Sequence, residues 1–115
     1  MREIKFRCWD TGINFMYYDT DSYNIYNEND NWLHSGYEDK YGTWHQNILM
    51  QYTGLKDKNG IEIYEFMEID DNFEVSFKDG CYVLINISNG DIILLYNYLK
   101  DKNGQVTVTK EFTKI

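Results

Sequence analysis

The sequence contains no proline and no alanine, and it has only two cysteines among 115 residues. Alanine is the strongest helix former, so its absence beside abundant Tyr, Ile, Phe, Trp and Val favours strands. Cys8 and Cys81 lie far apart and share no metal-ligand spacing with His34 or His45. This pattern predicts neither a zinc site nor a disulfide framework. We expect two reduced thiols, as in a cytosolic protein.

A long apolar run is also missing. No run reaches the roughly 20 residues that span a membrane, and Met1–Lys5 has no apolar signal-peptide core. We therefore expect no membrane contact and a cytoplasmic location in the cell that makes the protein.

Clustered positive charge is scarce. The formal charge is −8, and the only grouped bases are Arg2, Lys5 and Arg7. Two acidic runs, Asp10–Asp39 and Glu62–Glu74, contain no Lys or Arg. Because nucleic-acid binding depends on clustered bases, we expect no direct DNA binding. The acidic runs would suit a partner protein with a basic surface. Alternatively, they only keep a tyrosine-rich chain soluble.

Alternation of apolar and polar residues predicts a series of short strands. Residues 2–9 and 14–18 are predicted as a half-buried hairpin. Residues 19–40, rich in Asn, Asp, Ser, Gly and Tyr, are predicted as a long acidic loop with one short strand near residues 23–26. Ordered strands are expected to resume at residues 43–53.

One hexapeptide occurs twice, as Leu55–Gly60 and Leu99–Gly104. Both copies end in Asn-Gly, the strongest short hairpin signal, because both residues tolerate the positive φ of a type I′ turn. We interpret both copies as hairpin turns. A calcium-binding EF-hand loop is disfavoured, because neither copy has a carboxylate at the first or the twelfth loop position.

The C-terminal half contains further turns at Lys78–Gly80 and Asn89–Gly90. The apolar run Ile92–Leu95 is typical of a strand buried on both faces or of a short helix. Five or six short strands at this spacing predict a mainly β fold, or α+β with little helix. We expect one compact domain over residues 1–115. It would have an N-terminal hairpin and acidic loop in residues 1–43, and a small SH3-like or open barrel in residues 44–115.

No catalytic constellation is evident. Neither His34 nor His45 lies in a nucleophile motif, although 19 carboxylates leave an acid-pair mechanism open. Asp19 and Asp21 could hold magnesium beside a phosphate, but a solvated loop is the favoured interpretation. We expect no enzyme, no metal and no cofactor. Among the many aromatic residues, Trp32, Tyr37 and Tyr41 are candidates for a partner surface, or else they cap the barrel.

The segments Met1–Asp10 and Met50–Glu65 resemble the YopX family of phage and prophage proteins. This family begins with a Met-Arg-Glu-Ile-Lys-Phe-Arg type segment and has a central Gln-Tyr-Thr-Gly-Leu-Lys-Asp-Lys-Asn-Gly signature. The resemblance implies a phage or prophage origin, a bacterial host cell, a β-barrel-like C-terminal part and self-association into a homo-oligomer. It supplies no catalytic residues. The chain departs from the family pattern at Phe66–Met67, where the family has Gly-Asp.

We therefore hypothesise a phage accessory protein that acts without catalysis, by stoichiometric binding. It would inhibit a host defence effector, such as a CRISPR effector, through an acidic surface that resembles nucleic acid. The candidate partner-binding residues are Asp19, Asp21, Asp30, Trp32, Tyr37, Glu38, Asp39 and Phe66.

Two alternatives remain open. The first is an oligomeric sponge that sequesters a nucleotide immune signal. Aromatic rings would stack on the nucleobase, and Lys or Arg side chains would contact the phosphate. Its candidate ligand-binding residues are Arg2, Lys5, Arg7 and Trp9. The second is a regulator of lysogeny.

Overall fold

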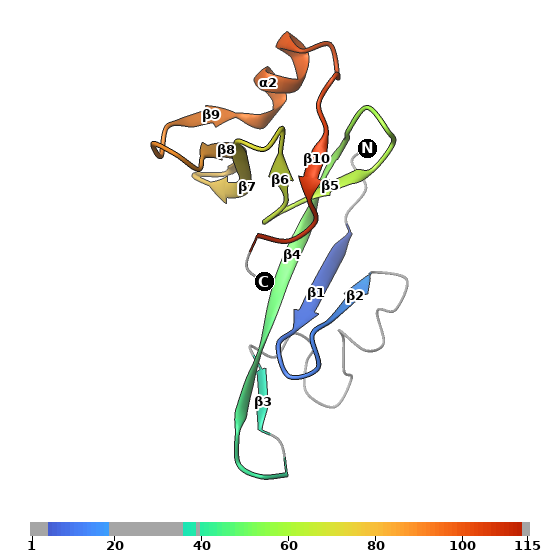
Figure 1. The fold of residues 1–115 in the computed structure, drawn as a ribbon, viewed down its shortest axis with the longest axis vertical. Helices are drawn as coiled ribbons and strands as arrows, with labels where there is room; N and C mark the ends of the chain where they lie inside the picture. Colours follow the sequence, from blue (N-terminus) through green and yellow to red (C-terminus); the bar gives the residue numbers. More distant parts are fainter. Residues whose placement is uncertain (1–4, 19–35, 39, 114–115) are drawn as a thin grey trace. The chain divides into compact units, whose positions relative to one another are not determined.

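The structure is a computed structural model that describes residues 5–18, 36–38 and 40–113 (Figure 1). Its contacts form two compact units, one of residues up to Gln51 and one that begins at Tyr52. The sequence places the division between hairpin and barrel before Trp44. The expectation of a single compact domain stays a prediction.

The first unit is an antiparallel sheet with the strand order β2-β1-β4-β3. Its strands are β1 (Phe6–Asp10), β2 (Phe15–Tyr18), β3 (Gly36–Glu38) and β4 (Trp44–Lys56). The first half of β4 belongs to this unit and pairs with both β1 and β3.

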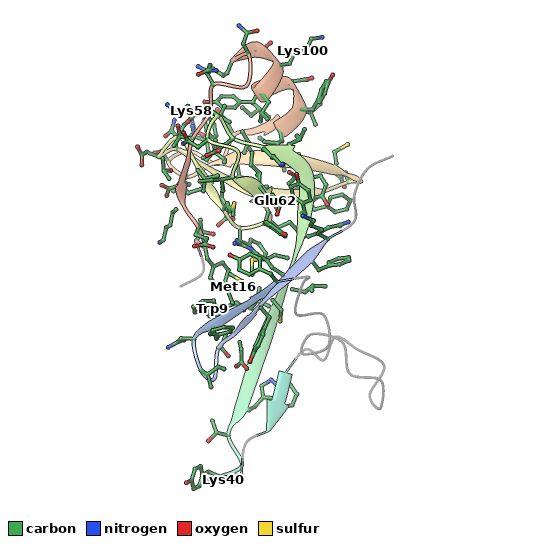
Figure 2. All side chains as sticks on the ribbon, turned by 90° about the vertical axis from the view of Figure 1, so that its right-hand side faces the viewer. Trp9, Met16, Lys40, Lys58, Glu62 and Lys100 are labelled. Carbon is green, nitrogen blue, oxygen red and sulfur yellow. The ribbon has the colours of Figure 1, made fainter. Side chains whose placement is uncertain are left out.

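The β1–β2 hairpin confirms the first predicted turn. Trp9 pairs with Met16 across the two strands (Figure 2). The Asp10 carboxylate accepts a hydrogen bond from the Gly12 N–H at 2.8 Å, a typical turn contact of this residue type. The burial of Cys8 agrees with the predicted half-buried strand, but Arg7 departs from it, because this residue points to the opposite face and is also buried.

Strand β3 lies inside the segment that the sequence predicts to be a loop. Tyr37 pairs with His45, and Glu38 pairs with Trp44. The loop prediction is therefore wrong at Gly36–Glu38. The polar composition of this segment gives no strand signal. Gly36–Glu38 forms a strand because its backbone pairs with β4, which the local sequence does not specify. The predicted strand near residues 23–26 lies outside the described residues.

The second unit contains the sheet β10-β6-β7-β8-β9, and the end of β4 pairs with β5. All of these strand pairs are antiparallel. The elements are β5 (Glu62–Tyr64), β6 (Glu68–Ile69), β7 (Phe73–Lys78), β8 (Cys81–Asn86), β9 (Ile92–Leu94), α2 (Leu95–Asp101) and β10 (Val108–Lys110).

A hydrophobic core stabilises the second unit. Each side chain of this size contributes about 1.5–3 kcal/mol when it leaves water. The core members with almost no exposed surface are Ile63, Ile69, Val75, Leu84, Leu95, Val106 and Phe112.

The fold is mainly β with a curled half-barrel sheet, which confirms the predicted fold class. The described residues include one short helix, α2. No helix in the described ranges is long and apolar enough to span a membrane.

The two copies of the hexapeptide adopt different structures. In the first copy the Gly60 N–H donates to the Asp57 carbonyl at 3.0 Å, and Gly60 has a φ of 81°. This copy is a hairpin turn between β4 and β5, as predicted. Asn59 does not have a positive φ, so the turn is not the expected type I′.

The second copy ends helix α2, so its predicted hairpin is wrong. The Gly104 N–H donates to the Leu99 carbonyl at 2.9 Å, and the Asn103 N–H donates to the Lys100 carbonyl at 3.1 Å. Asn103 has a φ of 53°. These two bonds and the left-handed residue define a Schellman motif at a helix C-terminus. The same six-residue sequence therefore forms a hairpin turn in one place and the C-terminal end of a helix in the other.

The run Ile92–Leu95 also differs from its predicted burial. Ile92, Ile93 and Leu94 form the edge strand β9 and are 48%, 38% and 44% exposed. Only Leu95, the first residue of α2, is fully buried. The prediction of a strand buried on both faces is wrong, because successive residues of β9 point to opposite faces and all three are more than a third exposed.

Phe66 occupies the position where the YopX pattern has glycine. Its φ is 65°, in the left-handed region that a side chain disfavours. The Phe66 N–H donates to the Val75 carbonyl at 2.8 Å, and its carbonyl accepts from the Thr113 N–H at 2.7 Å. Its ring lies 6.4 Å from that of Phe112. These contacts hold a strained residue in place.

Candidate functional site

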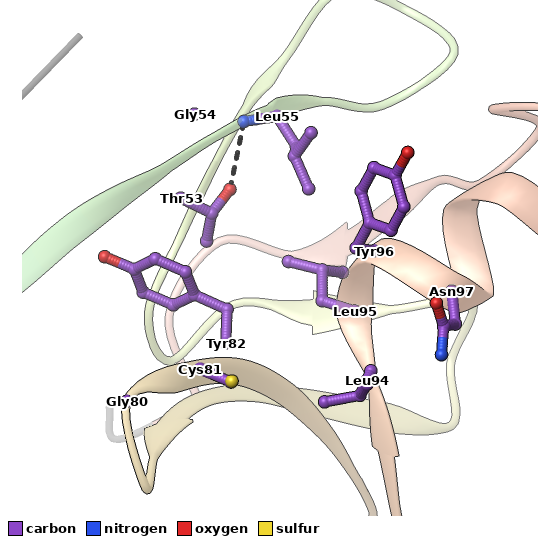
Figure 3. A pocket seen from close by; sticks show the side chains of 10 residues that line it. All are labelled: Thr53, Gly54, Leu55, Gly80, Cys81, Tyr82, Leu94, Leu95, Tyr96 and Asn97. Atoms are coloured by element: carbon purple, nitrogen blue, oxygen red, sulfur yellow. Dashed lines mark hydrogen bonds between the residues drawn. The ribbon is translucent and has the colours of Figure 1, made fainter. Parts of the chain in front are cut away.

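An open cleft of about 480 Å³ lies in the second unit (Figure 3). Three segments that are distant in sequence form it: the end of β4, the β7–β8 turn, and the junction of β9 with α2. Its volume falls within the range of small-ligand pockets, roughly 300–1,000 Å³. The lining residues are Thr53, Gly54, Leu55, Gly80, Cys81, Tyr82, Leu94, Leu95, Tyr96 and Asn97.

The first wall is a bulge in β4. Tyr52 pairs with Tyr64 and Lys56 with Glu62, so β4 has three residues where β5 has one. Gly54 supplies the bend with a φ of 87°. The Thr53 hydroxyl oxygen accepts a hydrogen bond from the Leu55 N–H at 3.2 Å (Figure 3). The bulge thus presents Thr53–Leu55 to the cleft.

The second wall follows the β7–β8 hairpin. Asp79 and Gly80 have φ values of 53° and 84°, as a two-residue type I′ turn requires, which confirms the turn predicted there. The Tyr82 ring packs on Phe77 with centroids 5.0 Å apart. Its hydroxyl approaches the Tyr52 carbonyl at 3.5 Å. Tyr82 is thereby fixed at one side of the cleft.

The third wall is the β9–α2 junction. Leu94 ends β9 and is the N-cap of α2, while Leu95 is buried beneath the cleft. Tyr96, which is 65% exposed, lies across the cleft from Tyr82 (Figure 3). We call the exposed residues Ile92, Ile93 and Leu94 the edge surface. It adjoins the cleft through Leu94.

The cleft is suited to holding an uncharged group. None of its ten lining residues has a charged side chain, and the polar atoms come from hydroxyl, thiol and amide groups. In the described part of the chain, no three His, Cys, Asp or Glu side chains are grouped as metal ligands would be. Shape and hydrogen bonding would therefore select the ligand.

Four carboxylates outside the cleft hold the C-terminal segment. The Asp57 carboxylate accepts from the Val108 N–H at 3.0 Å, and the Asp70 carboxylate from the Thr107 N–H at 2.9 Å. The hydroxyl of Thr109 donates to Glu68, and the hydroxyl of Thr113 donates to Glu74. Three of the six acids in the second acidic run, Glu68, Asp70 and Glu74, therefore have a structural role that their charge alone did not predict.

Local charge and burial shift three pKa values. Burial raises the pKa of Asp57, but backbone N–H donors, Val108 first, outweigh it and lower the pKa below its usual value. Burial, and then the hydrogen bond to Asp70, raise the pKa of Tyr98 to about 12. Burial, and then the charge of Asp10, raise the pKa of the Cys8 thiol to about 11. Cys8 is therefore a poor nucleophile, whereas Cys81 is exposed at the cleft.

The structure places only some of the predicted binding residues. Tyr37 and Glu38 lie in β3, and Phe66 lies between β5 and β6. Asp19, Asp21, Asp30, Trp32, Asp39 and Arg2 lie outside the described residues.

The remaining nucleotide-binding candidates lie in or beside β1. Lys5 and Trp9 are half-buried, whereas Arg7 is fully buried. These candidates do not line the cleft.

Sequence reasoning missed Tyr82, Leu94 and Tyr96. The apolar run Ile92–Leu95, which is typical of a buried strand or of a short helix, was an available signal for Leu94 and for Tyr96 directly after it.

The comparisons with known proteins agree with this fold. The sequence profile described as YopX protein matches residues 5–108. The chain belongs to the YopX family. A solved structure with a similar fold is that of protein EF1440 from Enterococcus faecalis, with a TM-score of 0.58 and 20% sequence identity. The match covers 96% of this chain and 93% of that protein, and at this identity it concerns the fold alone. No curated protein matches the sequence.

Proposed function

We propose that this YopX protein is a phage or prophage accessory protein that acts without catalysis, by stoichiometric binding of a partner protein with a basic surface. The partner would be a host defence effector that the complex inhibits. The observation that carries the proposal is the exposed edge surface beside an uncharged cleft.

The apolar character of the edge surface supports a protein partner. Native proteins usually protect edge strands by keeping them very short or with charges, proline or bulges. β9 is three residues long, but Ile92–Leu94 has no charge, proline or bulge. Exposed apolar patches mark sites of interaction with proteins or membranes, or ligand-binding grooves, and Ile92 and Leu94 share one face of β9 beside the cleft. Tyr82 and Tyr96 add aromatic area of the kind enriched at binding hot spots.

Charge supports a basic partner. The chain carries −8, and seven carboxylates lie in Asp10–Asp39 without a single Lys or Arg. Those of Asp57, Glu68, Asp70 and Glu74 are engaged within the fold. These four carboxylates keep their charge, but residues 10–39 carry −7 of the net −8 because no base accompanies them. The attraction that this run would exert on a basic partner would weaken with salt.

A capture experiment tests the proposal. The tagged wild type, Ile92→Lys and Ile13→Lys are incubated with bacterial host lysate at about 0.05 M and about 0.5 M salt. Ile13 is a matched control, because it is an exposed isoleucine in the β1–β2 turn and belongs to the other compact unit. We expect a basic protein in near one-to-one amount at low salt, reduced by salt and by Ile92→Lys alone. The proposal fails if the captured material is the same for Ile92→Lys and the wild type.

A nucleotide sponge is the second candidate, and the pair Tyr82 and Tyr96 favours it. Two aromatic rings across a cleft of about 480 Å³ could stack on a base. A thermal-shift screen of cyclic and linear nucleotides against the wild type and Tyr96→Ala separates the two candidates. A shift lost in Tyr96→Ala would support the sponge, and flat curves would remove it.

A further inference from the structure

The outer edge of β9 has free backbone groups. The Asn86 N–H donates to the Asp91 carbonyl at 2.8 Å, which fixes the bonded pairs along β8 and β9. Because bonded and non-bonded pairs alternate in an antiparallel ladder, the next bonded pair is Leu84 with Ile93. The N–H groups of Ile92 and Leu94 therefore point away from β8. Among the described strands, none pairs with this side.

Leu94 gives this edge a defined end. As the N-cap of α2, its carbonyl faces the first helical turn, while its N–H stays on the strand edge. Its φ of −72° and ψ of 130° are those of an extended residue. The edge thus offers the N–H and C=O of Ile92 and the N–H of Leu94. An antiparallel strand could form about three hydrogen bonds here.

The cleft supplies side-chain selectivity at the same edge. Strand addition combines backbone hydrogen bonds with pockets for alternate side chains. The cleft starts at Leu94, where β9 ends, and its lining is uncharged. A charged side chain would lose its hydration there without an opposite charge, whereas an aromatic ring would contact Tyr82 and Tyr96.

Charge complementarity indicates what flanks the added strand. Asp91 precedes β9 directly and is exposed, and the whole chain carries −8. A strand with Lys or Arg beside its apolar residues gains from this charge, whereas a second copy of the chain brings another −8. A basic partner strand is therefore favoured over self-pairing.

We infer that β9 is a docking strand: an extended, basic-flanked segment of the partner protein adds to its free edge, with an apolar or aromatic side chain in the cleft. This inference rests on the proposed function and specifies how the partner binds. The main-chain bonds provide the attachment, and the cleft selects the side chain.

The test uses defined peptides and a matched pair of variants. The probes are Lys-Thr-Val-Tyr-Val-Thr-Lys, the same peptide with Glu at both ends, and a backbone N-methylated form of the first. Leu94→Pro removes the outward N–H at a φ that proline accepts, whereas Leu94→Val keeps it. The readouts are amide chemical shifts and hydrogen exchange, at Ile92 in all three proteins and at position 94 in the wild type and Leu94→Val, because proline has no N–H.

We expect the Lys-ended peptide to bind the wild type and Leu94→Val with similar weak affinity, of order 1 mM, and to protect both amides. Leu94→Pro, N-methylation and Glu ends should each weaken binding about tenfold or more. Equal binding by Leu94→Pro and Leu94→Val would overturn strand addition and leave a side-chain interface, with the proposed function intact.

Two further results would also overturn the inference. One is the absence of any response at Ile92 and Leu94 to all three peptides. The other is protection of these amides by rising protein concentration alone, which would show that a second copy covers β9. Lysate capture reports separately on the proposed function, because it requires only that a basic protein binds in a way that depends on Ile92, whether through side chains or through the backbone.

Discussion

The carboxylate of Asp57 accepts a hydrogen bond at 3.0 Å from the backbone N–H of Val108, which lies 51 residues further along the chain. The same carboxylate accepts from the N–H groups of Asn59 and Ile61, at 2.8 and 2.9 Å. One side chain thus closes the β4–β5 turn and attaches β10 to it. Leu55–Gly60, which is part of the segment that resembles the YopX family, therefore has a structural role: it joins β4, β5 and β10.

We predict that Asp57→Ala destabilises the protein by about 2–4 kcal/mol, because three partly buried N–H groups lose a charged acceptor. Asp101→Ala is the matched control, since Asp101 holds the same place in the second hexapeptide and is exposed. It should change stability by less than about 0.5 kcal/mol. Urea unfolding of both variants checks this, and equal losses would contradict the assigned role.

The same contact predicts an acid-sensitive contribution to stability. The pKa of Asp57 is lowered in the folded protein, so the ionised form is favoured by folding. Its contribution is complete above the ordinary carboxyl pKa and is lost as the pH falls through the lowered folded value. The stability difference between the wild type and Asp57→Ala should therefore narrow from pH 6 to about pH 2–3. A difference independent of pH would contradict this.

The same substitution at matching positions of the two hexapeptides should change the stability of the protein in opposite directions. Asn103 has a φ of 53° whereas Asn59 does not have a positive φ. Asn103→Gly should stabilise the protein by about 0.5–1 kcal/mol, because glycine suits the left-handed position that ends the helix. Asn59→Gly should destabilise it by about 0.5 kcal/mol through greater freedom of the unfolded chain. Thermal unfolding of both variants decides, and shifts of the same sign would contradict the two conformations.

At Phe66, glycine should be less destabilising than alanine, which is the reverse of the usual order. Phe66→Ala loses the ring contact with Phe112 and keeps a side chain at a φ of 65°, so it should cost about 2–3 kcal/mol. Phe66→Gly loses the same contact but relieves about 1 kcal/mol of backbone strain. Glycine should therefore be the less destabilising of the two in urea unfolding. The reverse order would show that the residue is unstrained.

The features that could be predicted from the sequence are those that neighbouring residues determine, such as turns and alternating strands. The turn at Asp79–Gly80 was found because two adjacent positive-φ residues leave a clear signal. The β1–β2 hairpin followed from its alternation, and the mainly β class followed from composition.

The remaining features depend on contacts between segments that are distant in sequence. Nothing local distinguishes Leu55–Gly60 from Leu99–Gly104, yet one joins two strands and the other ends a helix. The cleft could not be predicted, because its walls come from a β4 bulge, a hairpin and a strand–helix junction far apart in sequence. The run Ile92–Leu95 predicts a buried strand or a short helix because apolar residues usually mark burial, whereas Ile92–Leu94 form an exposed edge strand.

The most direct test of the account is calorimetric titration of the captured partner, once purified, into the wild type, Ile92→Lys and Ile13→Lys. The account predicts one partner per chain, affinity at least about tenfold weaker for Ile92→Lys, and a change within about twofold for Ile13→Lys. Equal affinity of Ile92→Lys and the wild type would contradict it, because the edge surface would then lie outside the interface.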